Sequence, residues 1–232
     1  MGNYQNGLES RKAILETAAK LFYEQGLNKT TYADISKAAN VRIGTISYHF
    51  GNTLTIASKI GNEELGAIFE NLKHLYGTEY SDFVLYSTTY LIYLIVFFKD
   101  PRYRKFHVEL EAATLHKNLT SDLEENQMSY ADYSNQFYRE KYRELNPDGD
   151  PIQEELYFSV FPGLSNSLNF FMINNLEKIS PEQAFRYSLS LYFQIFKFEN
   201  EEFERILADC MAIRDQLLIG NDGFHVFIQK KS

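Results

Sequence analysis

The chain of 232 residues is 44% hydrophobic and 16% aromatic, which is enough apolar surface for one large or two small domains. Its formal net charge is −8, and its single cysteine, Cys210, excludes an internal disulfide. The first twelve residues lack the apolar core of a signal peptide, and no stretch reaches the about 20 apolar residues of a membrane span. A cytoplasmic protein without a membrane partner is therefore expected.

The amino-terminal stretch predicts two helices and a sharp turn. From Ser10 to Gln25, apolar residues recur at helical spacing, and Gly26 then gives a stop signal. Thr31 and Asp34 form the pattern of a capping box, so a second helix should begin directly after Thr31. Asn40 should end it, because Asn tolerates the left-handed backbone that a sharp reversal needs.

A third, short helix is expected from Ile43 to Phe50. Ile46 and Phe50 lie four residues apart on one face, which leaves the other face to polar residues. A helix this short is not stable alone and must be held against the preceding helices, with its polar face outward, as a DNA-recognition helix is. Short helix pairs also occur in purely structural bundles, so the pattern alone leaves that alternative open.

The stretch from Arg11 to Ile60 carries ILETAAKLFYEQGLNKTTYADISKAANV and then GTISYHF, and it resembles the TetR-type (TetR/AcrR) transcriptional regulators. The resemblance implies an all-α fold. Residues 1–60 would form a three-helix, helix-turn-helix DNA-binding domain, and residues 61–232 a helical ligand-binding and dimerisation domain. Its implied partners are double-stranded operator DNA, a small-molecule effector and a second copy of the chain, with no cofactor.

Carried over residue by residue, the resemblance implies that Arg42, Gly44 and Thr45 meet base edges or nearby phosphates, whereas Tyr48 and His49 grip the DNA backbone. The full set of expected DNA-contacting residues is Thr31, Arg42, Gly44, Thr45, Ser47, Tyr48 and His49. A glycine at position 44 would let the DNA backbone approach closely, although the geometry of a helix start explains it equally well.

Three positions depart from the family pattern. Asn40 replaces the usual turn glycine, Ser47 stands where an aromatic residue is common, and Thr53 stands where a lysine usually touches phosphate. The last change removes one counterion-releasing contact. A helical interaction protein that forms dimers but has lost DNA affinity is therefore the alternative hypothesis.

The charge distribution agrees with an amino-terminal DNA-binding domain. Residues 1–60 contain seven Lys and Arg against four Asp and Glu, a balance of +3, so residues 61–232 carry −11. An acidic body would repel DNA, and only the amino-terminal part suits contact with it. Solvated acidic faces are also common in cytoplasmic proteins.

After residue 50 the pattern predicts further helices separated by short breaks. Their expected ranges are Leu54 to Tyr76, Tyr80 to Phe98, a helix opening at Pro101, Leu119 to Leu145, Ile152 to Leu176, Pro181 to Phe198 and Glu201 to Leu218. The segment from Tyr90 to Phe98 is apolar on every side, which is typical of a helix in the centre of a domain. The tail after Gly220 gives no clear prediction.

The helix from Ile152 carries a row of large apolar residues at four-residue steps, beside a row of small ones. The large row is Ile152, Leu156, Val160, Leu164 and Leu168, and the small row is Ser159, Gly163 and Ser167. The rows suit the two-fold helix bundle through which the resembling family forms dimers. Packing within one chain would explain the large row equally well.

No catalytic or metal-binding constellation is found. The five histidines show no metal-ligand spacing with Cys210 or with each other, and no nucleotide-binding or hydrolase motif occurs. His107, Glu109 and Glu111 are chemically suited to a site, but alternate residues of a helix do not share a face. Cys210 lies in an apolar helical register, so we expect a buried, inert thiol.

Aromatic rings are the body's most distinctive feature, with seventeen Tyr and nineteen Phe in the chain, most of them after residue 75. Ten of them are candidates for lining an effector pocket: Tyr86, Tyr90, Tyr93, Phe97, Phe106, Tyr130, Tyr133, Phe137, Tyr157 and Phe161. We expect an apolar or aromatic effector, and the acidic body favours a positive over a negative charge on it. The sequence thus predicts a homodimeric repressor that a small molecule releases from its operator, not an enzyme.

Overall fold

The computed structural model describes residues 2–114, 130–195 and 199–231. Its elements in chain order are α1 (Gly2–Gln25), η1 (Leu27–Lys29), α2 (Tyr32–Ala39), α3 (Ile43–Phe50), α4 (Thr53–Tyr76), α5 (Asp82–Lys99), α6 (Pro101–Thr114), α7 (Tyr130–Leu145), α8 (Pro151–Ile173), α9 (Pro181–Ile195), α10 (Asn200–Asp215), β1 (Leu217–Asp222) and β2 (His225–Lys230). The all-α class is confirmed. A two-stranded hairpin at its carboxyl end is the addition that the sequence analysis did not predict.

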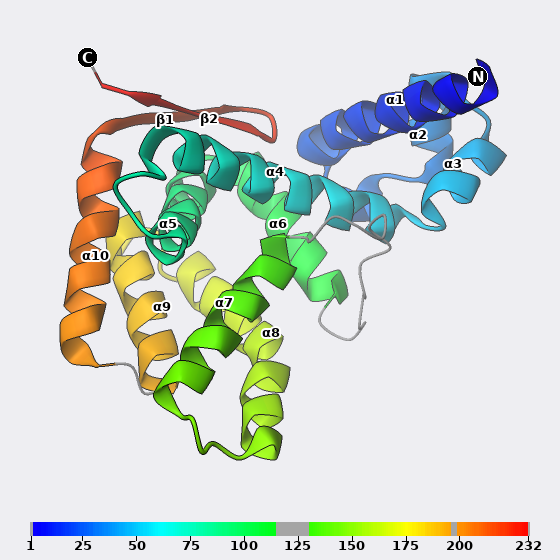
Figure 1. The fold of residues 1–232 in the computed structure, drawn as a ribbon. Coiled ribbons are helices and arrows are strands. Elements are labelled where there is room, and N and C mark those ends of the chain that lie inside the picture. Colours follow the sequence, from blue (N-terminus) through cyan, green and yellow to red (C-terminus); the bar gives the residue numbers. More distant parts are fainter. Residues whose placement is uncertain (1, 115–129, 196–198, 232) are drawn as a thin grey trace.

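Residues 2–50 form a small helical head, and α4 leads from it along the body that the later elements form (Figure 1). The predicted capping box is present: the Asp34 amide donates to Thr31 Oγ1 over 3.3 Å, and the Thr31 amide donates to Asp34 Oδ2 over 2.8 Å. Asn40 has φ 53° and ψ 43°, as a left-handed helix end requires. Ile46 and Phe50 are buried in the core of the head, so the predicted orientation of α3 is confirmed.

Helix α5 is the central helix of the body. It packs against α4, α6, α9, α10 and β1 and is buried over most of its length, as its all-round apolar pattern predicts. Among the described residues only α5 is long and apolar enough to cross a membrane, but 67% of that stretch is buried inside the protein. Such burial is typical of a core helix.

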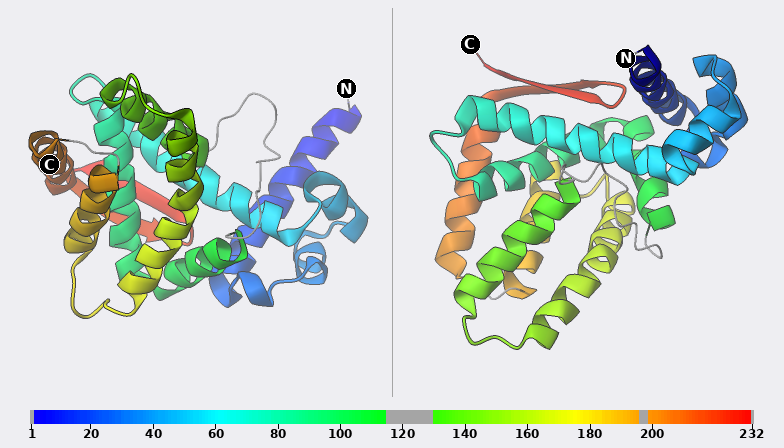
Figure 2. Two further views of the ribbon diagram at one scale, coloured as in Figure 1. Left: turned by 90° about the horizontal axis from the view of Figure 1, so that it is seen from below. Right: turned by 45° about the vertical axis from the view of Figure 1, so that its right-hand side comes forward.

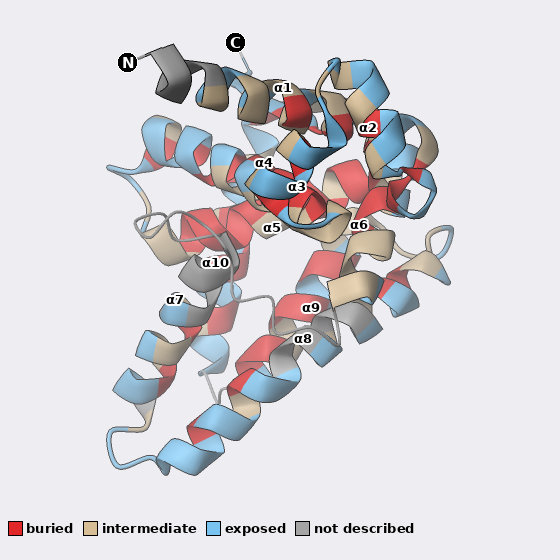
Figure 3. Ribbon diagram, turned by 90° about the vertical axis from the view of Figure 1, so that its right-hand side faces the viewer, coloured by how far each residue is buried: buried red, intermediate tan, exposed pale blue. Residues whose placement is uncertain are grey.

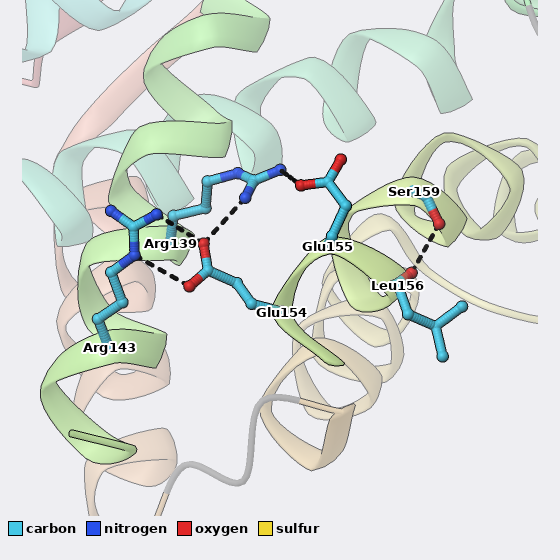
Figure 4. Close-up of polar contacts among 6 residues, drawn as sticks. All are labelled: Arg139, Arg143, Glu154, Glu155, Leu156 and Ser159. Atoms are coloured by element: carbon cyan, nitrogen blue, oxygen red, sulfur yellow. Dashed lines mark hydrogen bonds and ion pairs between the residues drawn. The ribbon is translucent and has the colours of Figure 1, made fainter. Parts of the chain in front are cut away.

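Helices α7 and α8 run side by side and are joined by the predicted loop after Leu145. Glu154 of α8 binds two arginines of α7: its carboxylate accepts from Arg139 at 2.9 Å and from Arg143 at 2.7 and 3.0 Å. These hydrogen bonds hold the pKa of Glu154 below its usual value. Figure 4 shows this cluster, with Leu156 pointing away from α7.

The carboxyl-terminal hairpin replaces the end of a predicted helix. That helix was expected to run to Leu218, but α10 ends at Asp215 and β1 begins at Leu217. The antiparallel register pairs Asp222 with His225, so the turn has two residues and begins at Gly223, whose φ is +61°. Apolar residues at alternate positions of β2 and this turn signal explain why a strand forms.

The tip of the hairpin reaches from the body to the head (Figure 2). Phe224 is buried at this tip, with its ring 4.3 Å from that of Phe106 in α6 and 5.5 Å from that of Tyr23 in α1, measured between centroids. Asp100, just before α6, accepts from Tyr23 Oη at 2.6 Å and from Asn221 Nδ2 at 2.7 Å. The hairpin therefore links the first and last segments of the chain.

Two predicted ends differ by several residues: α1 begins at Gly2 and not at Ser10, and α8 ends at Ile173 and not at Leu176. The predicted helix from Leu119 corresponds to α7, which begins at Tyr130; its expected residues 119–129 lie outside the described part, as do residues 196–198 at the end of the helix from Pro181. The proposed division between residues 60 and 61 stays a prediction. It falls within the continuous helix α4.

Candidate functional site

The outward face of α3 carries most of the residues predicted to contact DNA. Arg42, Gly44, Ser47 and Tyr48 are exposed, and Tyr48 keeps 86% of its surface accessible. Thr45 and His49 are partly exposed beside them. The buried residues of α3 face the opposite way, so these polar side chains lie together on the outward face, with the exposed Ile43 at the start of the helix.

Gly44 has no packing partner inside the protein. A Cβ atom added at this position would meet no atom within 4 Å, and its φ is not in the left-handed region. Neither crowding nor backbone conformation within the chain therefore requires glycine here. Close approach of an external surface remains as a reason for a residue without a side chain.

Thr31 is exposed at the start of α2, but its hydroxyl is already engaged. It donates to Asp34 Oδ2 over 2.6 Å and accepts from the Asp34 amide. These bonds from Thr31 also lower the pKa of the Asp34 carboxyl. A phosphate at Thr31 would have to displace the carboxylate, so Thr31 is the member of the predicted set least free to bind DNA.

The head contacts α6 of the body through polar groups that the sequence analysis did not single out. Lys105 Nζ donates to the Gln25 carbonyl over 2.9 Å, and the Asn28 amide donates to Glu109 Oε2 over 3.1 Å. Gly26 leaves little room between them, because an added Cβ would lie 2.7 Å from Lys105 Nζ. Helix α6 is thus fastened directly to the turn that follows α1.

The rings predicted to line a pocket fall into separate groups. Tyr90 stacks on Tyr93 with 6.0 Å between ring centroids, and Tyr86 lies 6.0 Å from Phe137. Phe97 lies beside Tyr93, and Phe106 packs against Phe22 of α1 and against Phe224. Tyr157 packs against Tyr142. The side chains of Tyr130, Tyr133 and Phe161 lie outside the described part.

A buried polar network joins α4 to α6, and the sequence analysis missed it. Glu64 of α4 accepts a hydrogen bond from Tyr103 Oη, and its Oε2 lies 3.1 Å from His107 Nε2. One turn further along α6, Glu111 accepts a hydrogen bond from the Asn169 amide of α8. His107 and Glu111 are four residues apart and share the inner face, whereas Glu109 faces the head, so the i, i+4 spacing was the available signal.

Cys210 is fully buried, as predicted. Its Sγ lies 3.6 Å from the Val84 carbonyl, and burial raises the pKa of the thiol to about 12. A thiol that stays protonated is a poor nucleophile and metal ligand. The described residues also contain no group of three or more His, Cys, Asp or Glu that could hold a metal ion.

The surface of α8 near the α7–α8 turn is apolar and exposed (Figure 3). Ile152 is 78% exposed, and Leu156 and Val160 follow on the same face, with the small residues beside them also exposed. Further along the helix, Leu164 and Leu168 pack against the core. The predicted large row is therefore divided between an open surface and packing within the chain.

Residues 14–57 match the family described as bacterial regulatory proteins, tetR family. The amino-terminal segment of the chain is therefore similar to this family. The matched segment covers the second half of α1, α2, α3 and the start of α4, so the family match falls on the head. This confirms the resemblance drawn from the sequence.

Proteins similar to this chain include the negative transcriptional regulator IcaR of the biofilm operon icaADBC in Staphylococcus epidermidis. It is 31% identical over 100 residues, which are 43% of this chain and 52% of IcaR. The transcriptional regulator TtgR of Pseudomonas putida is 36% identical over 67 residues, 29% of this chain and 30% of TtgR. The chain therefore matches about half or less of the length of these relatives, which are named as regulators.

A solved structure of NalD, described as the secondary repressor of the MexAB-OprM multidrug efflux pump in Pseudomonas aeruginosa, is 18% identical to this chain. The alignment covers 82% of this chain and 96% of NalD with a TM-score of 0.43.

Proposed function

We propose that the protein is a transcriptional repressor that binds a near-palindromic operator as a homodimer and releases it when a small molecule binds. Residues 1–60 would be the DNA-binding domain and residues 61–232 the ligand-binding and dimerisation domain. The observation that carries the proposal is the outward face of α3, where Gly44 has no internal reason to lack a side chain and Tyr48 is almost fully exposed.

Selection from a pool of random duplexes tests the proposal. A dimer with one recognition helix per subunit should select two inverted half-sites whose centres lie about 34–36 Å apart, or a multiple of that. Failure to select any sequence at low salt, or selection by a monomer, would overturn it. The alternative of a helical interaction protein without DNA affinity, which the departures at Ser47 and Thr53 favour, predicts that failure.

The exposed residues of α3 should divide into two classes. Tyr48→Ala should weaken binding to all duplexes nearly uniformly, because contacts to the DNA backbone carry little sequence information. Thr45→Ala should instead change which sequence is preferred, since a base contact is worth about 1–3 kcal/mol of discrimination. Arg42→Ala is expected to behave like Thr45→Ala and His49→Ala like Tyr48→Ala. Binding titrations on the selected and scrambled duplexes check this, and equal losses of specificity from all four changes would contradict the assignment.

Position 53 offers a gain-of-affinity prediction. Thr53 is the first residue of α4 and is partly exposed beside α3. Thr53→Lys should tighten operator binding and steepen the slope of log K against log salt by about one unit, because one more phosphate is neutralised. Thr53→Gln, which adds length without charge, is the control. An unchanged slope in Thr53→Lys would show that position 53 does not face the phosphates.

The contacts of α6 support a mechanism by which a bound effector would change the position of the head. Its outer face holds the head through Lys105 and Glu109, and its inner face carries His107 and Glu111. A shift of α6 at the inner face would therefore act on the turn after α1. Coupling requires that the effector bind the two arrangements of α6 with different affinity.

A further inference from the structure

The interior polar cluster between α5, α6 and α8 contains a carboxylate that the protein only partly satisfies. Glu111 accepts one hydrogen bond, from the Asn169 amide, and Asn169 itself is buried. A carboxylate can accept about four hydrogen bonds. Part of the Glu111 side chain remains accessible to solvent, so a bound molecule could reach it.

A second polar group in this cluster, the hydroxyl of Tyr93, also lacks a hydrogen-bond partner among the described residues. Tyr93 is only 5% exposed, and its hydroxyl makes no hydrogen bond to any described residue. Leaving a buried hydroxyl unbonded is costly, and such groups in native proteins call for an explanation. Burial and then the neighbouring Glu111 carboxylate raise the pKa of Tyr93, and the Asn169 amide, which already donates to Glu111, opposes this.

The surroundings of these two groups suit a positive charge. The rings of Tyr90 and Tyr93 are stacked with an interplanar angle of 15°, and the Tyr90 hydroxyl lies 3.3 Å from Ser188 Oγ. The titratable groups that face Glu111 are His107 on its own helix and Tyr90 and Tyr93 on α5, and Glu64 of α4 lies behind His107. Desolvation raises the pKa of Glu111, and a cation beside it would reverse this effect.

We propose that Glu111 is the anchor for a primary or secondary ammonium group of an aromatic effector, with Tyr93 Oη accepting a second hydrogen bond and the Tyr90 ring beside the charge. An ammonium group supplies the donors that both oxygens lack, and aromatic faces attract cations. This inference rests on the proposed function and names the effector class for its ligand site. It also places the anchoring carboxylate on α6, the same helix as Lys105 and Glu109, whose side chains contact the head.

The test compares three probes that share a 1-naphthylmethyl group: 1-naphthylmethylamine, which is cationic, 1-naphthylmethanol, which is neutral, and the anion of 1-naphthylacetic acid. Calorimetry on the full chain without DNA should show that the amine binds and the other two bind at least about tenfold more weakly, since a charge-assisted hydrogen bond is worth that factor or more. Near the raised pKa of Glu111, binding of the amine should release protons and should weaken as the pH falls and the carboxylate is protonated.

Glu111→Gln keeps the shape and the acceptor for Asn169 but removes the charge. It should weaken amine binding by about tenfold to a hundredfold and abolish the proton release. Glu70→Gln, an exposed change on α4 with the same loss of charge, should leave both unchanged. Matching thermal denaturation midpoints of the two variants would show that Glu111→Gln still folds.

Three outcomes would overturn the anchor: equal amine affinity in Glu111→Gln and the unsubstituted chain, binding of the neutral alcohol as tight as that of the amine, or no amine binding at all. Operator binding by the same samples is measured separately. A protein that binds its operator but fails these tests would refute the anchor alone, whereas one that binds the amine but selects no duplex would refute the proposed repressor function.

Discussion

Replacing Leu156 with aspartate is expected to convert the protein from dimers to monomers and to weaken operator binding by about 10²–10⁴-fold, because two linked recognition helices bind far more tightly than one. Leu156 is 59% exposed on α8 and points away from α7 (Figure 4). Ile152, Val160 and Phe170 extend the same apolar surface, and Phe170 is 70% exposed. A charge in the centre of such a surface would be buried without a partner in a dimer.

Sedimentation or light scattering measures the oligomeric state, and a duplex titration measures the affinity. The matched control is Leu218→Asp, which places the same charge at a leucine that is 53% exposed on β1, away from α8. Because both leucines are exposed, neither change should unfold the monomer. A Leu156→Asp protein that remains dimeric would show that this apolar surface is not the dimer interface.

Glu64→Ala is expected to lower the free energy of unfolding by about 3–5 kcal/mol, the usual cost of removing one member of a buried pair. The carboxylate of Glu64 is 3% exposed and bonds both Tyr103 and His107, so its removal leaves two buried polar groups on α6 without their acceptor. Chemical denaturation of the purified variant measures this change.

The neighbouring Glu63 is the control for this prediction. It is 54% exposed and pairs only along its own helix with Lys59, 3.0 Å away. Glu63→Ala should change stability by about 0.5 kcal/mol or less, as exposed pairs of this kind do. If the two alanine variants were equally stable, the network between α4 and α6 would not contribute to holding these helices together.

The head could be predicted from the sequence because its signals are local. A capping box at Thr31, a left-handed Asn40 and the four-residue spacing of Ile46 and Phe50 each lie within one or two turns of helix. In the head, helix propensity, helix capping and the spacing of apolar residues all indicate the same helices. The assignment of individual DNA contacts on α3 stays a prediction, since it depends on a partner that the chain alone does not contain.

The effector side of the molecule was less accessible to sequence reasoning because its contacts are distant in the chain. Glu64 meets His107 across 43 residues, and Asn169 meets Glu111 across 58. A list of aromatic residues cannot tell that Phe106 joins the head and the hairpin while Tyr90 and Tyr93 stack in the body. The hairpin was missed because six-residue strands give a weak periodic signal beside long helices.

The contact between Tyr23 and Phe224 spans 201 residues of chain, from the first helix to the turn of the last hairpin. On the ribosome the head is synthesised early, and its local helices can form at once. The contacts of the head with α6 can form once α6 has been made, whereas those with Asn221 and Phe224 have to wait for the hairpin. The head is therefore attached to the body in two stages, first by α6 and later by the hairpin, and only the second stage fixes Tyr23 against Phe224.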